Sequence, residues 1–189
     1  MTTSSQPKPS AERRMARFLG ALALTAVLAA IITGAGVVSS SGPAKAKQAI
    51  TRTDAGSFPI SSAVAVPAGA DVVYLSGMTP AVADPNAPKG STQAFGDTAT
   101  QTVSVLNKIK DALAAQKLTM GDVVMMHVYL VGDPAHDGKM DFAGMMSGYT
   151  QFFGTADQPN KPARSTVQVA GLAAPGLLVE IEVIAARVP

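Results

Sequence analysis

Arg164 and two glutamates further along the chain, Glu180 and Glu182, are the residues whose types and spacing could do chemistry. The sequences around Arg164 and around the two glutamates are each typical of a strand. Alternation places Arg164 and Thr166 on the same face of the first strand, and Glu180 and Glu182 on the same face of the second. An arginine holds a carboxylate through two parallel hydrogen bonds, and a nearby glutamate can orient or deprotonate a water molecule. Such a pair would suit the hydrolysis of a compound that carries a carboxylate. Spacing alone favours a simpler interpretation, an ordinary ion pair between strands on a solvated face.

Other kinds of reactive site find little support in this sequence. The chain has no cysteine, which excludes disulfides, thiolate metal ligands and cysteine nucleophiles. His127 lies in an apolar stretch and His136 in a polar loop, and neither has a second His or Cys at ligand spacing, so we expect no metal site. The sequence contains no G-x-S-x-G elbow, phosphate-binding loop or dinucleotide fingerprint. A serine triad is therefore not expected either.

The composition is that of a folded domain and does not suggest a nucleic-acid-binding surface. Hydrophobic residues make up 47% and charged residues 15% of the 189 residues, enough apolar sequence for a packed core. The formal net charge is +2, but residues 1–46 alone carry +4, which leaves −2 for the rest of the chain. Nucleic-acid binding needs clustered Lys and Arg, and a stacking platform needs aromatic side chains, which are scarce here.

The N-terminal 46 residues have the layout of an export signal. Arg13, Arg14 and Arg17 precede residues 18–38, a run of 21 residues without a charge. A small-residue motif would allow a signal peptidase to cleave after Ala46. Alternatively, residues 18–38 are long enough, at about 1.5 Å per residue, to remain as an inner-membrane anchor. Both alternatives predict a periplasmic or otherwise exported protein that meets the membrane only through this leader.

The remaining sequence predicts one α+β domain at residues 58–189, after a polar, turn-rich linker at 47–57. Periodicities of two and of three to four residues indicate strands and helices in the order ββαβαββ. The expected strands are Ser61–Val66, Val72–Ser76, Val123–Val131, Arg164–Val169 and Leu177–Arg187, and the expected helices run from Asp97 or Thr98 to Gln116 and from Asp141 to Phe153. The first two strands should form a hairpin through Ala68–Asp71.

Two helices on one face of a sheet make a two-layer sandwich and leave the other sheet face uncovered. That face would carry Val, Ile and Met as well as polar residues. Because an exposed apolar face usually has a partner, the pattern predicts a homo-oligomer that packs sheet against sheet.

The sequence resembles the RidA/YjgF family of small imine deaminases, from about Phe58 to Ala186. The motifs that carry the resemblance are Val73–Gly77, Gln101-Thr102, Leu106–Ile109, Asp122–Val124, Val128–Leu130, Asp141-Phe142, Tyr149 with Phe152-Phe153, Pro162–Ser165 and Val179–Glu182. Each motif is short, but their order and spacing together are specific.

The resemblance implies a chorismate-mutase-like fold and a homotrimer, in which the sheets form a central barrel and three clefts lie between subunits. It also implies hydrolysis of 2-imino or 2-enamino acids to 2-keto acids and ammonia, without a metal or organic cofactor. Arg164 matches the arginine that holds the substrate carboxylate, and Glu180 matches the acidic residue that positions water. Ser76 and Gly77 match a segment that lines the cleft.

Four cleft positions depart from the family pattern. Ile60, Met78, Met146 and Thr166 stand where the family usually has Tyr, Gln, Asn and Cys. The carboxylate subsite is retained while several polar wall positions are apolar, which predicts an altered range of substrates. Two hypotheses follow: an exported imine deaminase with altered specificity, or a non-catalytic small-carboxylate-binding or chaperone-like trimer that has lost the deaminase activity.

Overall fold

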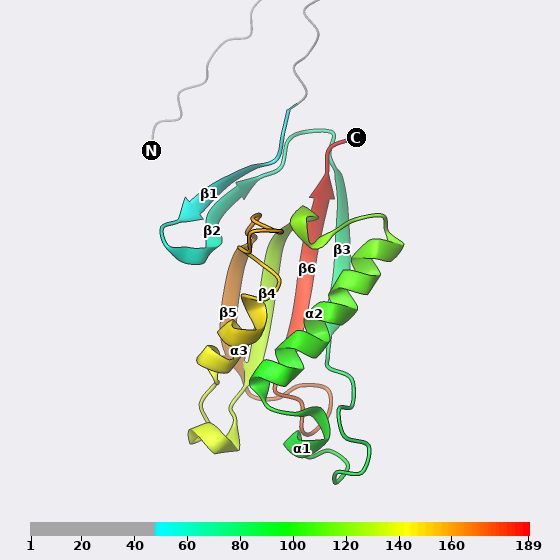
Figure 1. Ribbon diagram of the computed structural model, residues 1–189, viewed down its shortest axis with the longest axis vertical. Coiled ribbons are helices and arrows are strands. Elements are labelled where there is room, and N and C mark those ends of the chain that lie inside the picture. Colours follow the sequence, from blue (N-terminus) through cyan, green and yellow to red (C-terminus); the bar gives the residue numbers. More distant parts are fainter. Residues whose placement is uncertain (1–47) are drawn as a thin grey trace, which may run out of the picture. The chain divides into compact units, whose positions relative to one another are not determined.

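The computed structural model of the protein describes residues 48–189, which form a six-stranded sheet with helices on one side (Figure 1). Its strands and helices, in chain order, are β1 (Thr51–Ala55), β2 (Phe58–Ala65), β3 (Asp71–Met78), α1 (Thr92–Phe95), α2 (Thr98–Ala115), β4 (Val123–Val131), α3 (Phe142–Tyr149), β5 (Ala163–Val169) and β6 (Val179–Arg187). Two short 3-10 turns, η2 (Met120–Asp122) and η3 (Pro134–His136), flank β4.

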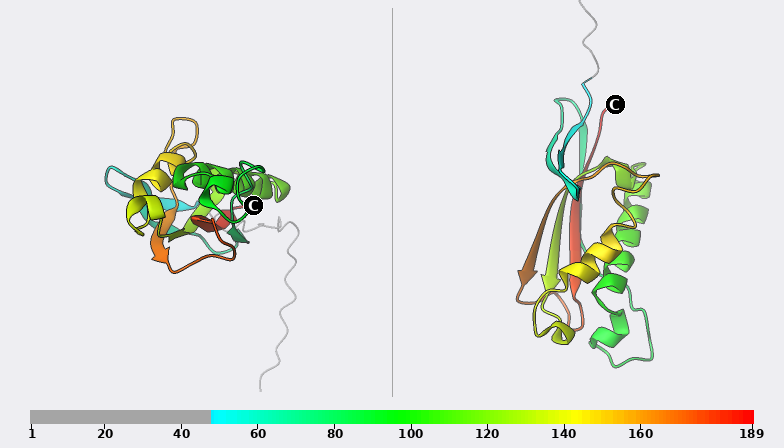
Figure 2. Two further views of the ribbon diagram at one scale, coloured as in Figure 1. Left: turned by 90° about the horizontal axis from the view of Figure 1, so that it is seen from below. Right: turned by 60° about the vertical axis from the view of Figure 1, so that its left-hand side comes forward.

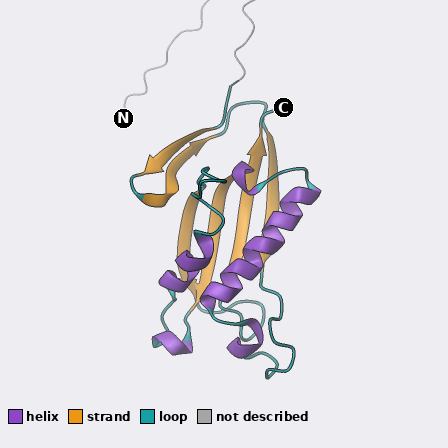
Figure 3. Ribbon diagram, in the orientation of Figure 1, coloured by secondary structure: helices purple, strands orange, loops and turns teal. Residues whose placement is uncertain are grey.

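The strand order across the sheet is β1-β2-β5-β4-β6-β3. The parallel neighbours β4 and β5 are connected through α3, whereas β6 runs antiparallel between β4 and β3. Both α2 and α3 lie on the same side of the sheet, as the right-hand view of Figure 2 and the colours of Figure 3 show. The predicted two-layer α+β sandwich is therefore confirmed.

Helix α2 forms where the sequence predicts it. The side chain of its N-cap, Asp97, accepts a hydrogen bond from the backbone N–H of Thr100 at 2.8 Å, which satisfies one of the free donors of the first turn. Leu106, Ile109 and Leu113 recur at intervals of three or four residues and are all fully buried. The helix thus covers the sheet with one apolar stripe.

Helix α3 also begins as predicted, with Asp141 accepting from Gly144 N at 2.8 Å, but it ends earlier. The sequence predicts a helix to Phe153, whereas the last helical residue is Tyr149. The chain then turns, since the backbone N–H groups of Phe152 and Phe153 both donate to Tyr149 O. The turn still places Phe153 in the core, which explains why the apolar pattern continues past the end of the helix.

The alternation along β4 separates a covered sheet face from an open one. Met126, Val128 and Leu130 are fully buried beneath the helices. The intervening His127 and Tyr129 remain partly exposed on the opposite face. Within residues 48–189 both α2 and α3 pack on the first face, so the open sheet face expected from the sequence is present.

Residues 51–55, expected to belong to a polar linker, instead form strand β1. This strand pairs antiparallel with β2, and Arg52 lies opposite Val64. Its sequence, TRTDA, has no large apolar side chain, so local pattern does not reveal it. The strand is stabilised by tertiary contacts of the Arg52 side chain, described below.

The predicted hairpin between the next two strands is wrong. Pro67 and Ala70 do form a turn, with Ala70 N donating to Pro67 O at 3.3 Å. The strands then separate: β2 pairs with β1 and β5, whereas β3 pairs with β6 at the opposite edge of the sheet. A turn reverses the chain but does not choose a strand's partner, and here Val73 and Leu75 of β3 pack on the core beside β6.

No helix in residues 48–189 is long and apolar enough to cross a membrane. The leader and its segment 18–38, predicted as a signal peptide or membrane anchor, lie outside the described residues.

Candidate functional site

Arg164 points from β5 toward the helix layer. In the parallel pairing of β4 with β5, Arg164 lies opposite Met126, whose side chain is buried under the helices. The Arg164 Cζ atom lies 4.3 Å from the ring centroid of Tyr149 and 5.9 Å from those of Phe58 and Phe142. Three aromatic faces therefore surround one cation and stabilise its charge.

No acidic side chain in residues 48–189 forms an ion pair with Arg164. Its Nη2 atom contacts Met146 Sδ at 3.2 Å, a weak acceptor, and its Nη1 atom is buried without a hydrogen-bond partner. Burial lowers the pKa of the guanidinium from its ordinary value, because desolvation disfavours the charged form. A partly buried cation with an unpaired donor is costly unless an anion reaches it.

Thr166 adds a second unpaired polar atom to the same face. It lies two residues beyond Arg164 in β5, opposite Val128 of β4, and its Oγ1 atom is buried without a partner. Residues two apart on a strand are separated by roughly 7 Å and project to one side. A carboxylate could therefore accept from Arg164 while Thr166 binds a neighbouring polar group.

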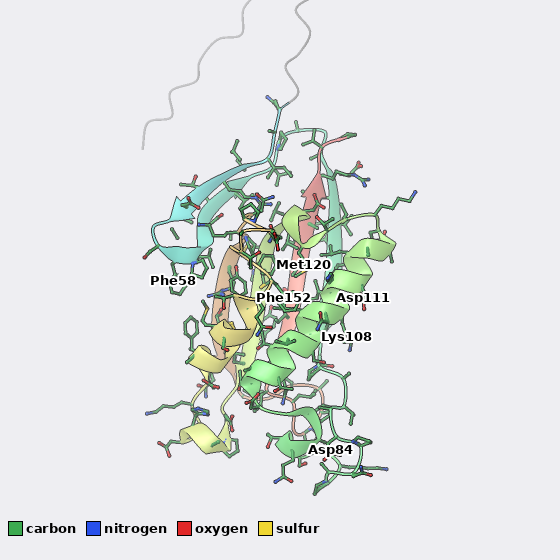
Figure 4. The ribbon with its side chains drawn as sticks, in the orientation of Figure 1. Phe58, Asp84, Lys108, Asp111, Met120 and Phe152 are labelled. Atoms are coloured by element: carbon green, nitrogen blue, oxygen red, sulfur yellow. The ribbon has the colours of Figure 1, made fainter. Side chains whose placement is uncertain are left out.

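The walls around these two residues are mostly apolar. Phe58 stacks on Phe142, with centroids 6.5 Å apart, and Figure 4 shows Phe58 at the start of β2, beside α3. Ile60 of β2 packs against the apolar core, in a stretch where the pairing of β2 with β1 is irregular. Met146 of α3 contacts Arg164 directly. Three predicted site residues, Arg164, Thr166 and Met146, thus lie together, and with Phe58, Phe142 and Tyr149 we call them the arginine cluster. The fourth, Ile60, directly follows Pro59, whose carbonyl accepts the hydroxyl of Tyr149.

Tyr149 is the part of this cluster whose role the sequence did not reveal. Its hydroxyl donates to Pro59 O at 2.9 Å, so it connects α3 to β2 beneath the guanidinium. Burial raises the pKa of the phenol well above its usual value, which keeps it protonated as a donor. In the sequence Tyr149 belongs to the apolar stripe of α3 and is interpreted as core, and its side chain is indeed fully buried.

Glu180 lies on the other face of the sheet. In the antiparallel pairing of β4 with β6 it is opposite Tyr129, on the open face. Its carboxylate lies against Gly77, where an added Cβ would collide with Glu180 Oε1. The pairing of β3 with β6 is irregular between Leu75 and Met78, so Ser76 and Gly77 form a bulge beside Glu180. We call Ser76, Gly77 and Glu180 the glutamate cluster.

Met78, also predicted to bind substrate, lies elsewhere. It pairs with Ile181 and packs against the apolar core beneath the helices. Regular alternation would place Met78 with Ser76 on the open face, but the extra residue of the bulge puts Met78 on the helix face with Leu75.

One chain does not bring the arginine and glutamate clusters together. Strand β4 lies between β5 and β6, and Arg164 and Glu180 project from opposite faces of the sheet. The interpretation of these residues as an ion pair between strands is therefore wrong. Within one chain the predicted site is therefore divided: the arginine cluster lies on the helix side of the sheet and the glutamate cluster lies on the open face.

Glu182 takes part in a hydrogen-bond network on the open face. Its Oε1 atom accepts from Tyr129 OH at 3.1 Å and lies 2.9 Å from His127 Nδ1. The hydrogen bond to Glu182 raises the pKa of Tyr129 from its usual value. Strand alternation could have identified this network, because His127 and Tyr129 share a face of β4 and Glu182 lies opposite His127.

His136 of the polar loop lies 3.4 Å from Asp133 and 3.9 Å from Asp141. Both carboxylates accept backbone hydrogen bonds at helix starts, from Ala135 N and Gly144 N. Residues 48–189 contain no group of three or more His, Asp or Glu side chains arranged to hold a metal ion.

A hollow of about 640 Å³ lies apart from both clusters, where Met120 and Phe152 approach each other in Figure 4. Part of its polar lining is paired: Asn160 Nδ2 donates to Gly121 O, and Gln158 Nε2 donates to Phe152 O. None of the predicted site residues lines it. The unpaired guanidinium, and not the volume of this hollow, identifies the candidate site.

Residues 57–187 match the sequence profile of a family described as endoribonuclease L-PSP. A RutC family protein of Pyrococcus horikoshii is 38% identical over 98 residues, which cover 52% of this chain and 69% of that protein. The Rid family protein YyfB of Yersinia pestis has a similar structure, with 25% identity and a TM-score of 0.51 over 68% of this chain and 87% of that chain. Rv2704 of Mycobacterium tuberculosis, from the YjgF/YER057c/UK114 family, is 30% identical with a TM-score of 0.46 over 74% of this chain and 100% of that chain.

Proposed function

The chain belongs to the endoribonuclease L-PSP family, that of the YjgF and Rid proteins, and we propose that it hydrolyses 2-imino or 2-enamino acids to 2-keto acids and ammonia. The observation that carries the proposal is the guanidinium of Arg164, partly buried and without an anionic partner in residues 48–189. Family membership agrees with the motifs recognised in the sequence. The reaction itself rests on the site.

The arginine cluster suits a small carboxylate. The free Nη1 of Arg164 can donate one hydrogen bond to it, and Nη2 can exchange its weak contact with Met146 Sδ for a second. The aromatic surroundings exclude water and make this charge-assisted contact stronger than it would be at an exposed surface. The unpaired Thr166 Oγ1 would bind a polar group next to the carboxylate.

The glutamate cluster would come from a second copy of the chain. Arg164 and Glu180 of one chain face opposite sides of the sheet, so a complete site needs a neighbour. The open sheet face carries exposed apolar side chains, among them Val167 and Tyr74. We propose a homotrimer in which each cleft joins the arginine cluster of one subunit to Ser76, Gly77 and Glu180 of the next.

Glu180 would act on the water molecule. Water adds to the imine carbon next to the carboxylate, and Glu180 takes the proton that the water loses. Glu180 delivers this proton to the imine nitrogen, which gives the carbinolamine. The hydroxyl proton of the carbinolamine then moves through Glu180 to the amino nitrogen, the C–N bond breaks, ammonia leaves, and the carbonyl of the 2-keto acid forms. Arg164 holds the carboxylate throughout and fixes the imine carbon relative to Glu180.

A non-catalytic carboxylate binder is the second candidate. The observation in its favour is the apolar wall of Ile60 and Met146, which offers the imine nitrogen no strong hydrogen-bond partner. Such a protein would keep the carboxylate contact of Arg164 but release no ammonia.

Ribonuclease activity, the name of the family, is a weaker proposal for this chain. Residues 47–189 carry a net charge of −2, whereas binding of a polyphosphate backbone needs clustered cations.

The N-terminal leader leads us to propose that the protein acts outside the cytoplasm, free or attached to the inner membrane.

The test is turnover of imines made in solution. An amino-acid oxidase generates 2-imino acids, and the release of keto acid and ammonia is compared with and without the purified protein. We expect acceleration by the wild type. Arg164→Lys should lose about 1–3 kcal/mol of carboxylate binding, because an ammonium cannot make the two-pronged contact. Arg187→Lys, which changes an exposed arginine on the far end of β6, is the matched control and should keep the wild-type rate.

Mixing two inactive variants tests the shared site. Arg164→Met and Glu180→Gln each remove one half, and subunits exchanged at random between them should restore about a quarter of the sites. Wild-type protein that binds 2-keto acids without accelerating hydrolysis would favour the binder. Inactivity together with no binding would contradict both candidates.

A further inference from the structure

Arg52 of β1 holds three backbone carbonyls at once. Its Nη1 atom donates to Val123 O and to Lys161 O, each at 2.9 Å, and its Nη2 atom donates to Gly121 O at 3.0 Å. Desolvation by burial lowers the pKa of this guanidinium from its usual value. Hydrogen bonds from a charged donor are stronger than those from a neutral one, so this contact anchors β1.

The acceptors belong to two segments that are far apart in sequence. Gly121 lies in η2, Val123 is the first residue of β4, and Lys161 lies in the loop that leads into β5. Lys161 O also accepts from Ser61 Oγ of β2 at 2.6 Å, and Ser61 N donates to Pro162 O at 2.9 Å. Backbone at 161–162 is therefore held from both β1 and β2, immediately before the strand that carries Arg164.

The same hairpin forms a wall of the arginine cluster. Strand β2, which pairs with β1, brings Phe58 to 5.9 Å from Arg164 Cζ. Pro59 O of β2 accepts the hydroxyl of Tyr149, whose ring lies on the guanidinium. Arg52 lies in the same hairpin as β2 and bonds to the segment that leads into β5. It therefore links β2, a wall of the site, to the strand that carries Arg164.

Apart from its ladder with β2, little else attaches β1 to the rest of the sheet. Its residues TRTDA include no large apolar side chain. The ion pair between Lys161 and Asp54 is short, at 2.7 Å, but the Asp54 side chain is 69% exposed, so solvent screens it. Removal of the Arg52 guanidinium should free the hairpin relative to β5.

We propose that Arg52 is a positioning residue of the carboxylate site: it fixes β2 and the start of β5 at the spacing that Arg164 needs to receive its ligand. The identity of that ligand rests on the proposed function, whereas the clamp itself does not.

The first test needs no ligand. Hydrogen–deuterium exchange is measured on full-length wild type, Arg52→Lys and Arg52→Met. In Arg52→Met we expect faster exchange in β1, in β2 and at residues 161–166, with α2 and β6 unchanged, and Arg52→Lys should lie between this variant and the wild type. Arg187→Met, which removes a cation bonded to Lys117 O and Asp71 at the other edge, is the control and should leave these segments unchanged. Unaltered exchange at 58–61 and 161–166 in Arg52→Met would overturn the clamp.

The second test is calorimetry with 2-oxobutanoate as the probe. Misfolding alone would lower the fraction of protein that binds and leave the Kd of the folded fraction as it was. A positioning role predicts full stoichiometry with a Kd raised about tenfold in Arg52→Met and partly restored in Arg52→Lys. An unchanged Kd, in a wild type that does bind, would overturn the positioning role. A wild type that binds no 2-keto acid would overturn the proposed function and the positioning role, and leave the clamp to the exchange result.

Discussion

At the scale of single residues, the site depends on how a few polar groups are paired. Arg164 has aromatic faces around it and no counter-ion in the described chain, whereas Arg52, also a partly buried arginine, donates three hydrogen bonds to backbone carbonyls. The two arginines therefore have different roles although burial lowers the pKa of both. A buried donor without a partner indicates a ligand, and donors bonded to backbone carbonyls indicate a structural role.

Tyr149 gives a prediction about stability in alkaline solution. Burial raises its folded-state pKa, so its contribution to the free energy of unfolding is complete below about pH 10, the usual tyrosine value, and falls as the pH rises further. Tyr149→Phe removes the hydrogen bond to Pro59 O and should cost about 1 kcal/mol at pH 7. Urea unfolding of both proteins between pH 7 and about pH 11 should show this difference shrinking above pH 10.

Ser57→Ala is the control for loss of a hydroxyl, because Ser57 is exposed in the turn between β1 and β2, away from the open sheet face. Its stability at pH 7 should equal that of the wild type. A difference between wild type and Tyr149→Phe that stays constant to high pH would mean that the phenol is not buried as described.

At the scale of elements, short α3 determines the geometry above Arg164. It supplies Met146 and Tyr149, and its start depends on the hydrogen bond from Gly144 N to Asp141. A helix of eight residues has few internal hydrogen bonds, so its cap matters more than in the long α2.

Asp141→Ala should therefore affect both stability and binding. Loss of the cap costs about 1 kcal/mol, and fraying of α3 should weaken binding of 2-oxobutanoate. Asp97→Ala removes the equivalent cap of α2, away from Arg164, and should lower the melting temperature similarly without weakening binding. Thermal unfolding and calorimetry of both variants separate the two effects. Equal losses of affinity in the two variants would contradict a specific role for α3.

At the scale of the whole molecule, the two faces of the sheet differ in kind. One face packs on the helices, while the other carries exposed Val167 and Tyr74 around the network of His127, Tyr129 and Glu182. These polar groups are paired within the chain, so the open face can become buried without leaving them unsatisfied. A second copy of the same face is the partner that the proposed trimer requires.

Val167→Glu tests this assembly. Val167 lies on the open face of β5 and is 47% exposed, so a buried glutamate in the interface should dissociate the oligomer. Sedimentation should then show single chains, and imine hydrolysis should be lost, because each cleft needs two copies. Val82→Glu, at an exposed loop position, should change neither property. A wild type that sediments as a single chain would contradict the trimer.

Much of the architecture follows from the amino-acid sequence alone. The apolar periods of α2, the continuous β4 and the capping residues Asp97 and Asp141 are local signals. The structure has α2 and β4 at the predicted positions and begins α3 at the predicted cap, although α3 ends four residues early. The family could also be recognised, because its motifs are spread in order along the chain.

Only the tertiary structure decided how these elements meet. Alternation assigns neighbours within one strand to a face, but the faces of β5 and β6 are related only through their register with β4. That register places Arg164 and Glu180 on opposite sides of the sheet. Strand β1 and the separation of β2 from β3 likewise depend on contacts between residues far apart in sequence, such as those of Arg52, which no local pattern encodes.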